Sequence, residues 1–226
     1  MRTLAIGDIH GCFVSLAELA KFVPFEPTDR LITIGDYVDR GPASCEVLDW
    51  LIARKMNGTL IPIRGNHELM MSAARRSDRH YDEWIACGGR AALSSYARPR
   101  RKAGLEDVPS AHWQFIEREC RSYYEIDTHF FVHANAYPDI PLSEQPDYML
   151  YWEQFNDPPP HESGKIMVCG HTPQDDGLPR SIGHAVCIDT RVYAGGWLTC
   201  LDVTSGEYWQ ANEQCQTRKG FLDPIA

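Results

Sequence analysis

Five short polar clusters in this sequence hold residues of the types that bind metals and move protons. Each cluster follows a run of apolar residues, and each places its aspartate, asparagine or histidine near a glycine or an alanine. The clusters are Gly7-Asp-Ile-His-Gly11, Gly35-Asp-Tyr-Val-Asp-Arg-Gly41, Gly65-Asn-His-Glu68, Phe131-Val-His-Ala-Asn135 and Gly170-His-Thr172. Their candidate metal donors include two aspartates, one asparagine and three histidines, without any thiolate. This donor set suits divalent Mn, Fe, Zn or Ni.

The apolar runs predict the strands that position these clusters. Buried strands are expected at 3–6, 31–34 and 60–63, with helices at 13–23 and 43–56 between them. Asp8 and Asp36 are 28 residues apart, and Asp36 and Asn66 are 30 apart, distances that suit a strand, a helix and a return. Successive βαβ units would gather the polar residues at one edge of a parallel sheet, where open α/β sheets bind ligands.

The second half of the chain changes character. Two further helices are expected at 79–97 and 109–121. Strands are then expected at 123–126, 129–133, 166–169, 185–188, 198–203 and 207–210. Residues 137–164 form a proline-rich loop that leaves one histidine cluster and returns to the next, so we expect it to pass near the site and to shape specificity, with packing against the sheet as the alternative.

Length and charge restrict the class of protein. The 226 residues, 43% of them hydrophobic, suit one globular domain over 1–226. The 22 basic and 31 acidic residues give a net charge of -9, which argues against a nucleic-acid partner, because such proteins cluster Lys and Arg. Residues 1–7 are too short for a signal peptide, and no apolar run approaches a membrane span, so we expect a soluble, cytoplasmic protein with no membrane partner.

The motifs resemble the phosphoprotein-phosphatase branch of the calcineurin-like metallophosphoesterases, whose signatures are GD-x-HG, GD-x-VDRG, GNHE, HAG and GHT. Four of the five match in full and in order, and Asn135 replaces the last glycine of the fourth. The resemblance covers roughly residues 3–203, and Trp84, Gly88-Gly89 and Tyr96 look like the helical insert of the small bacterial and phage members. It implies an α/β fold, an αββα sandwich with a dinuclear metal centre at the strand ends.

Carried over residue by residue, the resemblance implies two divalent metal ions as cofactors, with Mn favoured and Fe, Zn or Ni as alternatives. Asp8 and His10 would bind one ion, and Asp36 would bridge both. The ligands implied for the second ion are Asn66, His133 and His171. A water molecule between the ions would be acidified and would attack phosphorus directly.

The resemblance also implies the catalytic residues. His67 would protonate the leaving group, and Asp39 would hold His67 in the required tautomer. Arg40 would bind two phosphate oxygens through its planar guanidinium, with Asn66 as a further substrate contact.

One family feature is missing. Members usually carry a second phosphate-binding arginine between the HAG and GHT histidines, but the only cation between His133 and His171 is Lys165. Arg191, after Ile188-Asp-Thr190, is the candidate replacement, with a plain surface arginine as the alternative.

These observations favour a metal-dependent phosphomonoesterase acting on phosphoserine or phosphothreonine in proteins. The rival interpretation is a dinucleoside tetraphosphatase or a broad phosphodiesterase on the same two metals, because the aromatic residues of loop 137–164 could stack on a nucleobase. The partner is accordingly a phosphorylated protein or a small phosphoester. A binding module without activity is disfavoured, since all six expected ligands are intact.

Overall fold

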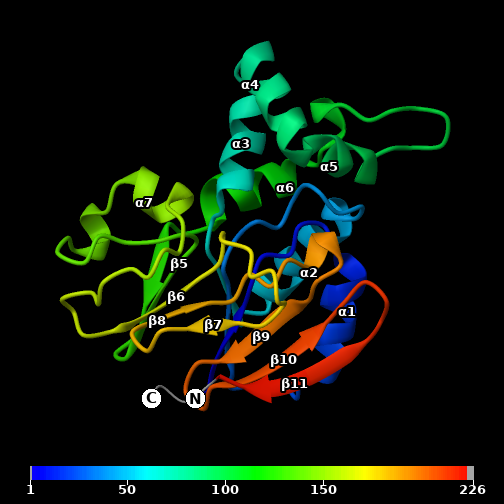
Figure 1. Ribbon diagram of the computed structural model, residues 1–226. Helices are drawn as coiled ribbons and strands as arrows, with labels where there is room; N and C mark the ends of the chain where they lie inside the picture. The colour runs from blue at the N-terminus through cyan, green and yellow to red at the C-terminus, as the bar shows by residue number, and fades with distance from the viewer. Residues whose placement is uncertain (1, 223–226) are drawn as a thin grey trace.

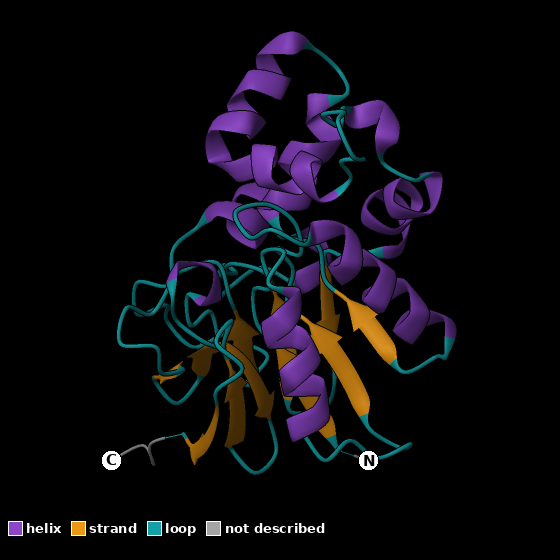
Figure 2. Ribbon diagram, turned by 90° about the vertical axis from the view of Figure 1, so that its right-hand side faces the viewer, coloured by secondary structure: helices purple, strands orange, loops and turns teal. Residues whose placement is uncertain are grey.

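The computed structural model describes residues 2–222, which form two β-sheets with helices on both outer sides (Figures 1 and 2). The first sheet has the strand order β11-β10-β9-β1-β2-β3, and the second has the order β4-β5-β6-β8-β7. The first sheet is built from β1 (Thr3–Ile6), β2 (Arg30–Thr33), β3 (Leu60–Pro62), β9 (Leu198–Asp202), β10 (Glu207–Ala211) and β11 (Thr217–Phe221). The second is built from β4 (Tyr123–Glu125), β5 (His129–Val132), β6 (Ile166–Cys169), β7 (Arg180–Ser181) and β8 (Ala185–Cys187). This architecture agrees with the expected αββα sandwich.

Parallel pairing brings the polar strand ends together. In the first sheet β1, β2 and β3 are parallel neighbours, and in the second β5, β6 and β8 are parallel. The last strands return to the start of the chain, since β9 pairs antiparallel with β1 in the register Ala5 to Leu201. The carboxyl ends of β1, β2, β3, β5 and β6 are therefore available to one site.

Alternating side chains along β1 build two separate cores. Leu4 and Ile6 pack toward the helices, whereas Ala5 packs into the layer between the two sheets. That middle layer also contains Ile32, from β2, and Phe131, from β5. This arrangement follows from the twofold side-chain period of a strand, and it fixes one sheet against the other.

Helices cover the first sheet on its outer side. Helices α1 (Phe13–Phe22) and α2 (Ser44–Met56) lie within one or two residues of the predicted ranges. The outer side of the second sheet is covered by η4 (Leu142–Glu144), α7 (Asp147–Trp152) and the loop around them, which contribute Leu142, Leu150 and Phe155 to the core there.

A helical insert stands above the strand ends (Figure 2). It consists of α3 (Asn66–Ala74), α4 (Asp78–Trp84), η1 (Ile85–Gly89), α5 (Arg90–Ser95), η2 (Leu105–Asp107), α6 (Ser110–Gln114) and η3 (Phe115–Glu119). The predicted helix 79–97 is interrupted at Gly88, whose φ of 116° kinks it. Helix α3, helix α7 and strands β7 and β11 were not predicted.

Within residues 2–222, no helix is both long enough and apolar enough to cross a bilayer.

Candidate metal centre and active site

The strand ends place the six expected ligands next to one another. Asp8 and His10 follow β1, Asp36 follows β2, and Asn66 is the first residue of α3 after β3. His133 follows β5 and His171 follows β6, so the second sheet supplies the remaining two. All six are buried except His171, which is half-buried.

Two groups of metal-binding atoms share Asp36. The ligand atoms of Asp36, His133 and His171 lie within 4.8 Å of one another, and so do those of His10, Asp36 and His67. The amide of Asn66 lies 2.9 Å from His133 Nε2, within the first group. Asp8 is not in the second group, where His67 is found instead.

The buried histidines present unprotonated nitrogens to this cluster. His10 Nδ1 lies 3.0 Å from the carbonyl of Val38, and His133 Nδ1 lies 3.0 Å from the carbonyl of Ile34, so each Nδ1 carries the proton and donates it. Burial lowers the pKa of His10 to about 3 and that of His133 to about 4. Both rings are therefore neutral at pH 7, and each has an unprotonated Nε2 that can bind a cation.

Asp8 lacks the partner that a metal ion would supply, whereas Asp36 is surrounded by imidazoles. Asp8 Oδ2 accepts the backbone N–H of His171 at 3.0 Å, but Oδ1 is buried without a hydrogen-bond partner among the described residues. Burial, with the nearby carboxylates of Asp189 and Asp36, raises the pKa of Asp8 well above its usual range. Burial also opposes the charge on Asp36, but the surrounding imidazoles, led by His133, hold its pKa well below the usual range. An orphaned carboxylate oxygen and converging neutral imidazoles fit divalent ions.

His67 is held by a buried carboxylate. Its Nδ1 lies 2.7 Å from Asp39 Oδ2, and both oxygens of Asp39 also accept the indole N–H of Trp84 at 2.9 Å. Burial works against the charged ring, but Asp36 and Asp39 outweigh it and raise the pKa of His67. The bond to Asp39 leaves Nε2 facing the metal-binding atoms, 3.9 Å from Asp36 Oδ2.

Glu68 is a supporting residue to which the sequence analysis gave no role. Its fully buried carboxylate accepts the backbone N–H groups of Asp36, Tyr37 and Gly65 at 2.8–2.9 Å, and that of Val38 at 3.2 Å. It therefore fixes the loop that carries Asp36 to the start of α3. The available signal was a glutamate three residues after Gly65, where its carboxylate accepts the N–H of Gly65 as in one half of a capping box.

Arg40 lies against the second group, beside His10. Its guanidinium is 3.0 Å from His10 Nε2 and stacks 4.4 Å above the ring of Tyr193, which itself meets His10 edge to face. Tyr193 was also missed, because its position after Thr190 carries no motif. Arg191 instead pairs with Asp175 in an exposed position, so it must leave this carboxylate to bind a phosphate. Its role as a second phosphate-binding arginine stays a prediction.

The backbone of the site is closely packed and adopts unusual conformations. A Cβ at Gly170 would lie 1.9 Å from Asp8 Oδ1, so only glycine fits there. Five non-glycine residues of the site have positive φ, which is unfavourable for residues other than glycine. They are His10, Asp36, Asp39, Arg40 and His171. Such strain persists where the surrounding structure enforces it, as in functional sites.

The proline-rich loop reaches the site through Trp152. The carbonyl of Trp152 lies 3.2 Å from His171 Nε2, so it accepts a hydrogen bond from this histidine and leaves Nδ1 toward the metal-binding atoms. The Trp152 residue is 41% exposed. An exposed tryptophan therefore belongs to the segment whose backbone contacts the candidate centre.

Comparisons with known proteins agree with this chemistry. The profile of the Calcineurin-like phosphoesterase family matches residues 1–198. A "Bis(5'-nucleosyl)-tetraphosphatase, symmetrical" from Methylobacillus flagellatus is 44% identical over 70 residues, which are 30% of this chain and 24% of the relative. The chain thus matches about a quarter of the length of this curated relative.

Solved structures share the fold at low sequence identity. A crystal structure provisionally described as a diadenosine tetraphosphatase has a TM-score of 0.66 and 18% identity, covering 98% of this chain and 93% of its own. The structure of a protein serine/threonine phosphatase from Saccharomyces cerevisiae has a TM-score of 0.59 and 16% identity, and the match covers 100% of this chain and 81% of that phosphatase. At these identities the likeness concerns the fold alone.

The expected activity on phosphoserine and phosphothreonine is wrong, because the relative with 44% identity carries the name of a tetraphosphatase, which was the rival interpretation. The metal chemistry is common to both activities. With a family profile that covers residues 1–198 and a cluster of histidine and aspartate ligands at the strand ends, the chain belongs to the calcineurin-like phosphoesterase family.

Proposed function

We propose that this protein hydrolyses dinucleoside tetraphosphates at the metal centre, cleaving the central phosphoanhydride. Water adds to one of the two inner phosphorus atoms, the bridging P–O bond breaks, and two nucleoside diphosphates leave. Two divalent ions, held by Asp8, His10, Asp36, Asn66, His133 and His171, would lower the pKa of the water and neutralise phosphate charge.

The residues around the metals have distinct parts in this proposal. Arg40 binds oxygens of the reacting phosphate, because a planar guanidinium matches two phosphate oxygens. His67 gives its Nε2 proton to the leaving phosphate oxygen, and Asp39 orients the ring through the 2.7 Å bond to Nδ1. Asp39 is thus a positioning residue, since it acts through His67.

One observation of the site favours a nucleotide: the exposed Trp152 next to His171. A nucleobase stacked on an aromatic side chain gains about 1–3 kcal/mol, which a phosphoserine peptide would not obtain there. The name of the tetraphosphatase from Methylobacillus flagellatus supports the same substrate class.

The deciding experiment compares kcat/KM of the Mn²⁺-loaded protein for diadenosine tetraphosphate, a phosphothreonine peptide and an aryl phosphodiester, with EDTA controls. The tetraphosphate is expected to be preferred by at least about fivefold, since stacking alone contributes about 1–3 kcal/mol. A preference for the peptide or the diester would overturn the proposal.

A pair of variants tests the role of Trp152. Trp152→Ala is expected to raise KM for the tetraphosphate by roughly 5- to 150-fold while kcat/KM for a small aryl phosphate stays the same. Phe221→Ala is the matched control, because Phe221 is an exposed aromatic residue on β11, 65% exposed, outside the site.

A further inference from the structure

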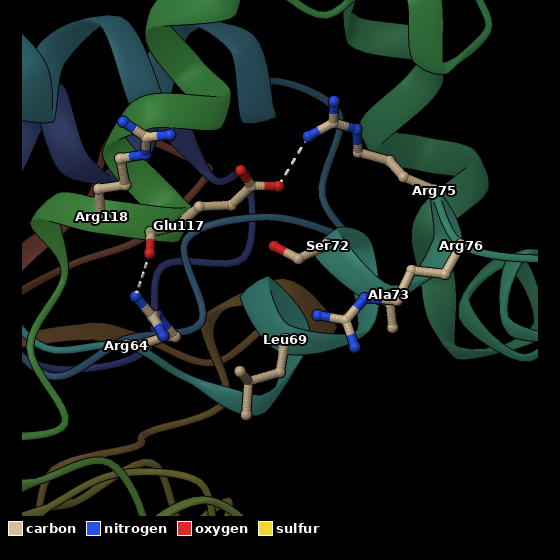
Figure 3. Close-up of a pocket in the computed structure, with 8 residues that line it drawn as sticks. All are labelled: Arg64, Leu69, Ser72, Ala73, Arg75, Arg76, Glu117 and Arg118. Carbon is tan, nitrogen blue, oxygen red and sulfur yellow. Dashed lines mark hydrogen bonds and ion pairs between the residues drawn. The ribbon is translucent and has the colours of Figure 1, made fainter.

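A pocket of about 730 Å³ lies beside α3, outside the metal centre. Six of the residues that line it are polar or charged: Arg64, Ser72, Arg75, Arg76, Glu117 and Arg118. Arg64 lies two residues before α3. Ser72 lies on α3, and Arg75 and Arg76 follow it directly. Glu117 and Arg118 lie on η3. Figure 3 shows them around a common space, with the Ser72 hydroxyl near its middle. This group is called the arginine pocket below.

The arginine pocket concentrates positive charge in an acidic protein. Four arginines and one glutamate line it, a local charge of +3, whereas the whole chain carries -9. Arg76 and Arg118 have no side-chain hydrogen bond or ion pair within residues 2–222. Like charges at this density repel one another unless an anion lies between them.

Two of the arginines are fixed in place. Arg64 Nη2 donates to the carbonyls of Glu117, at 2.8 Å, and Cys120, at 3.2 Å, while its Nε is buried without a partner among the described residues. Arg75 pairs with the Glu117 carboxylate at 2.7 Å and stacks 4.5 Å above Trp113. Figure 3 shows both interactions with Glu117 as dashed lines. Such fixed guanidinium groups form a prepared site, because their ordering cost is already met by the fold.

The pocket and the metal centre use different faces of α3. His67 and Glu68 are buried toward the active site, whereas Ser72 and the apolar Leu69 and Ala73 line the pocket. Residues 69, 72, 73 and 76 follow the helical spacing of a single stripe. Substitutions in the pocket therefore leave the catalytic side chains untouched.

The surroundings of Arg64 add an aromatic neighbour. On its other side lies a second hollow of about 570 Å³, lined by Arg121, Tyr123 and Tyr124 among others. Arg64 lines both spaces, so an anion bound to the arginines would have a tyrosine-lined hollow beside it.

We propose that the arginine pocket is a second, non-catalytic binding site for a short phosphate chain. Planar guanidinium groups bind phosphate oxygens in pairs, the Ser72 hydroxyl offers a further donor, and the volume is that of a small-molecule site. The chain belongs either to a nucleoside diphosphate or to a free oligophosphate. This site is separate from the proposed hydrolysis and does not depend on it.

The test is isothermal titration of the Mn²⁺-loaded protein with two probes, ADP and methylenediphosphonate. Each probe that the pocket accepts is expected to bind at two sites, one at the metals and one in the pocket. Arg76→Ala/Arg118→Ala is expected to weaken the pocket site by about tenfold or more, because it removes charge-assisted contacts. Arg79→Ala is the matched control, since Arg79 is an exposed arginine on α4 that does not line the pocket.

Several readouts separate the pocket from the active site. Asp36→Asn is expected to remove the metal site and to leave the pocket site, and the double arginine variant is expected to hydrolyse a small aryl phosphate as the unmodified protein does. If only ADP binds in the pocket, the ligand is a nucleoside diphosphate. If both probes bind there, the phosphate chain alone is sufficient for binding. The proposal is overturned if neither probe binds outside the metal centre, or if the double variant binds both probes unchanged. Hydrolysis of the tetraphosphate is measured separately, so either proposal can fail alone.

Discussion

Replacing Trp84 by phenylalanine tests the support beneath the proposed general acid. The indole N–H of Trp84 donates to both carboxylate oxygens of Asp39 at 2.9 Å, and Asp39 has no exposed surface. Phenylalanine keeps an aromatic ring against Gly89 but removes the donor. A hydrogen bond to a charged group contributes about 1.5–3 kcal/mol, so we expect the free energy of unfolding to fall by that amount.

Loss of the hydrogen bond from Trp84 to Asp39 has two measurable consequences. For a chain of this length about 2–4 °C of melting temperature correspond to 1 kcal/mol, so the melting temperature is expected to fall by roughly 3–12 °C. Because Asp39 then holds His67 less firmly, kcat is expected to fall by roughly 10-fold and by no more than about 150-fold, which is the same free energy expressed as a rate. Calorimetry and initial-rate kinetics on one preparation measure both.

Trp209→Phe is the matched control. Trp209 is 4% exposed, and its indole makes no hydrogen bond among the described residues. Its replacement therefore removes a similar volume without breaking a hydrogen bond. If Trp84→Phe melts within about 1 °C of Trp209→Phe and keeps its kcat, the indole does not support Asp39 and the reasoning is refuted.

Three further changes test other parts of the site. Glu68→Gln turns an acceptor of four backbone N–H groups into a side chain with its own N–H₂, and we expect about 1–3 kcal/mol lower stability in urea titration together with lower Mn content. Unchanged metal content would contradict the role of Glu68 in holding Asp36. Gly170→Ala is expected to lower metal content, because its Cβ would meet Asp8 Oδ1, whereas Gly164→Ala, with open space around the Cβ, is expected to keep the metals. Equal metal content in the two variants would refute the proposed contact between this Cβ and Asp8. His67→Asn is expected to slow hydrolysis of an alkyl phosphate about 10²-fold and that of the tetraphosphate less, because a phosphate leaving group, with a pKa of about 6, needs little protonation; equal losses on both substrates would contradict the general-acid role.

The strands were predictable because their sequence signal is local. Thr3–Ile6 and Ile166–Cys169 are short apolar runs closed by glycine, and the structure has strands with these bounds. Strand β11 was missed, since Thr217–Phe221 contains two charged residues and a glycine and lies at the edge of the sheet, paired with β10 alone.

Helix α3 was missed for a different reason. Its first residues, Asn66, His67 and Glu68, carry polar side chains that are all buried, which hides the usual apolar stripe. The helix starts there because Glu68 bonds back to Gly65, a tertiary and capping effect rather than a propensity. Helix α7 was hidden within the proline-rich loop because it spans only Asp147–Trp152.

The positions of the candidate site residues were predictable, whereas their geometry was not. Motif spacing identified Asp36 and His171, but their positive φ values come from contacts with other segments of the chain. In the same way, Tyr193 reaches Arg40 only through the fold, more than 150 positions further along the chain.

The division of the proposed ligands between two sheets has a consequence for synthesis of the chain. Asp8, His10, Asp36 and Asn66 belong to the first sheet and precede His171, of the second, by at least 105 residues. At about 5–20 residues per second, even the last of these four leaves the ribosome roughly 5–20 s before His171. During that interval the growing chain holds an incomplete set of ligands, with weak affinity for any ion. If these residues are the ligands, we expect complete metal binding only after β6 has been synthesised and both sheets have met.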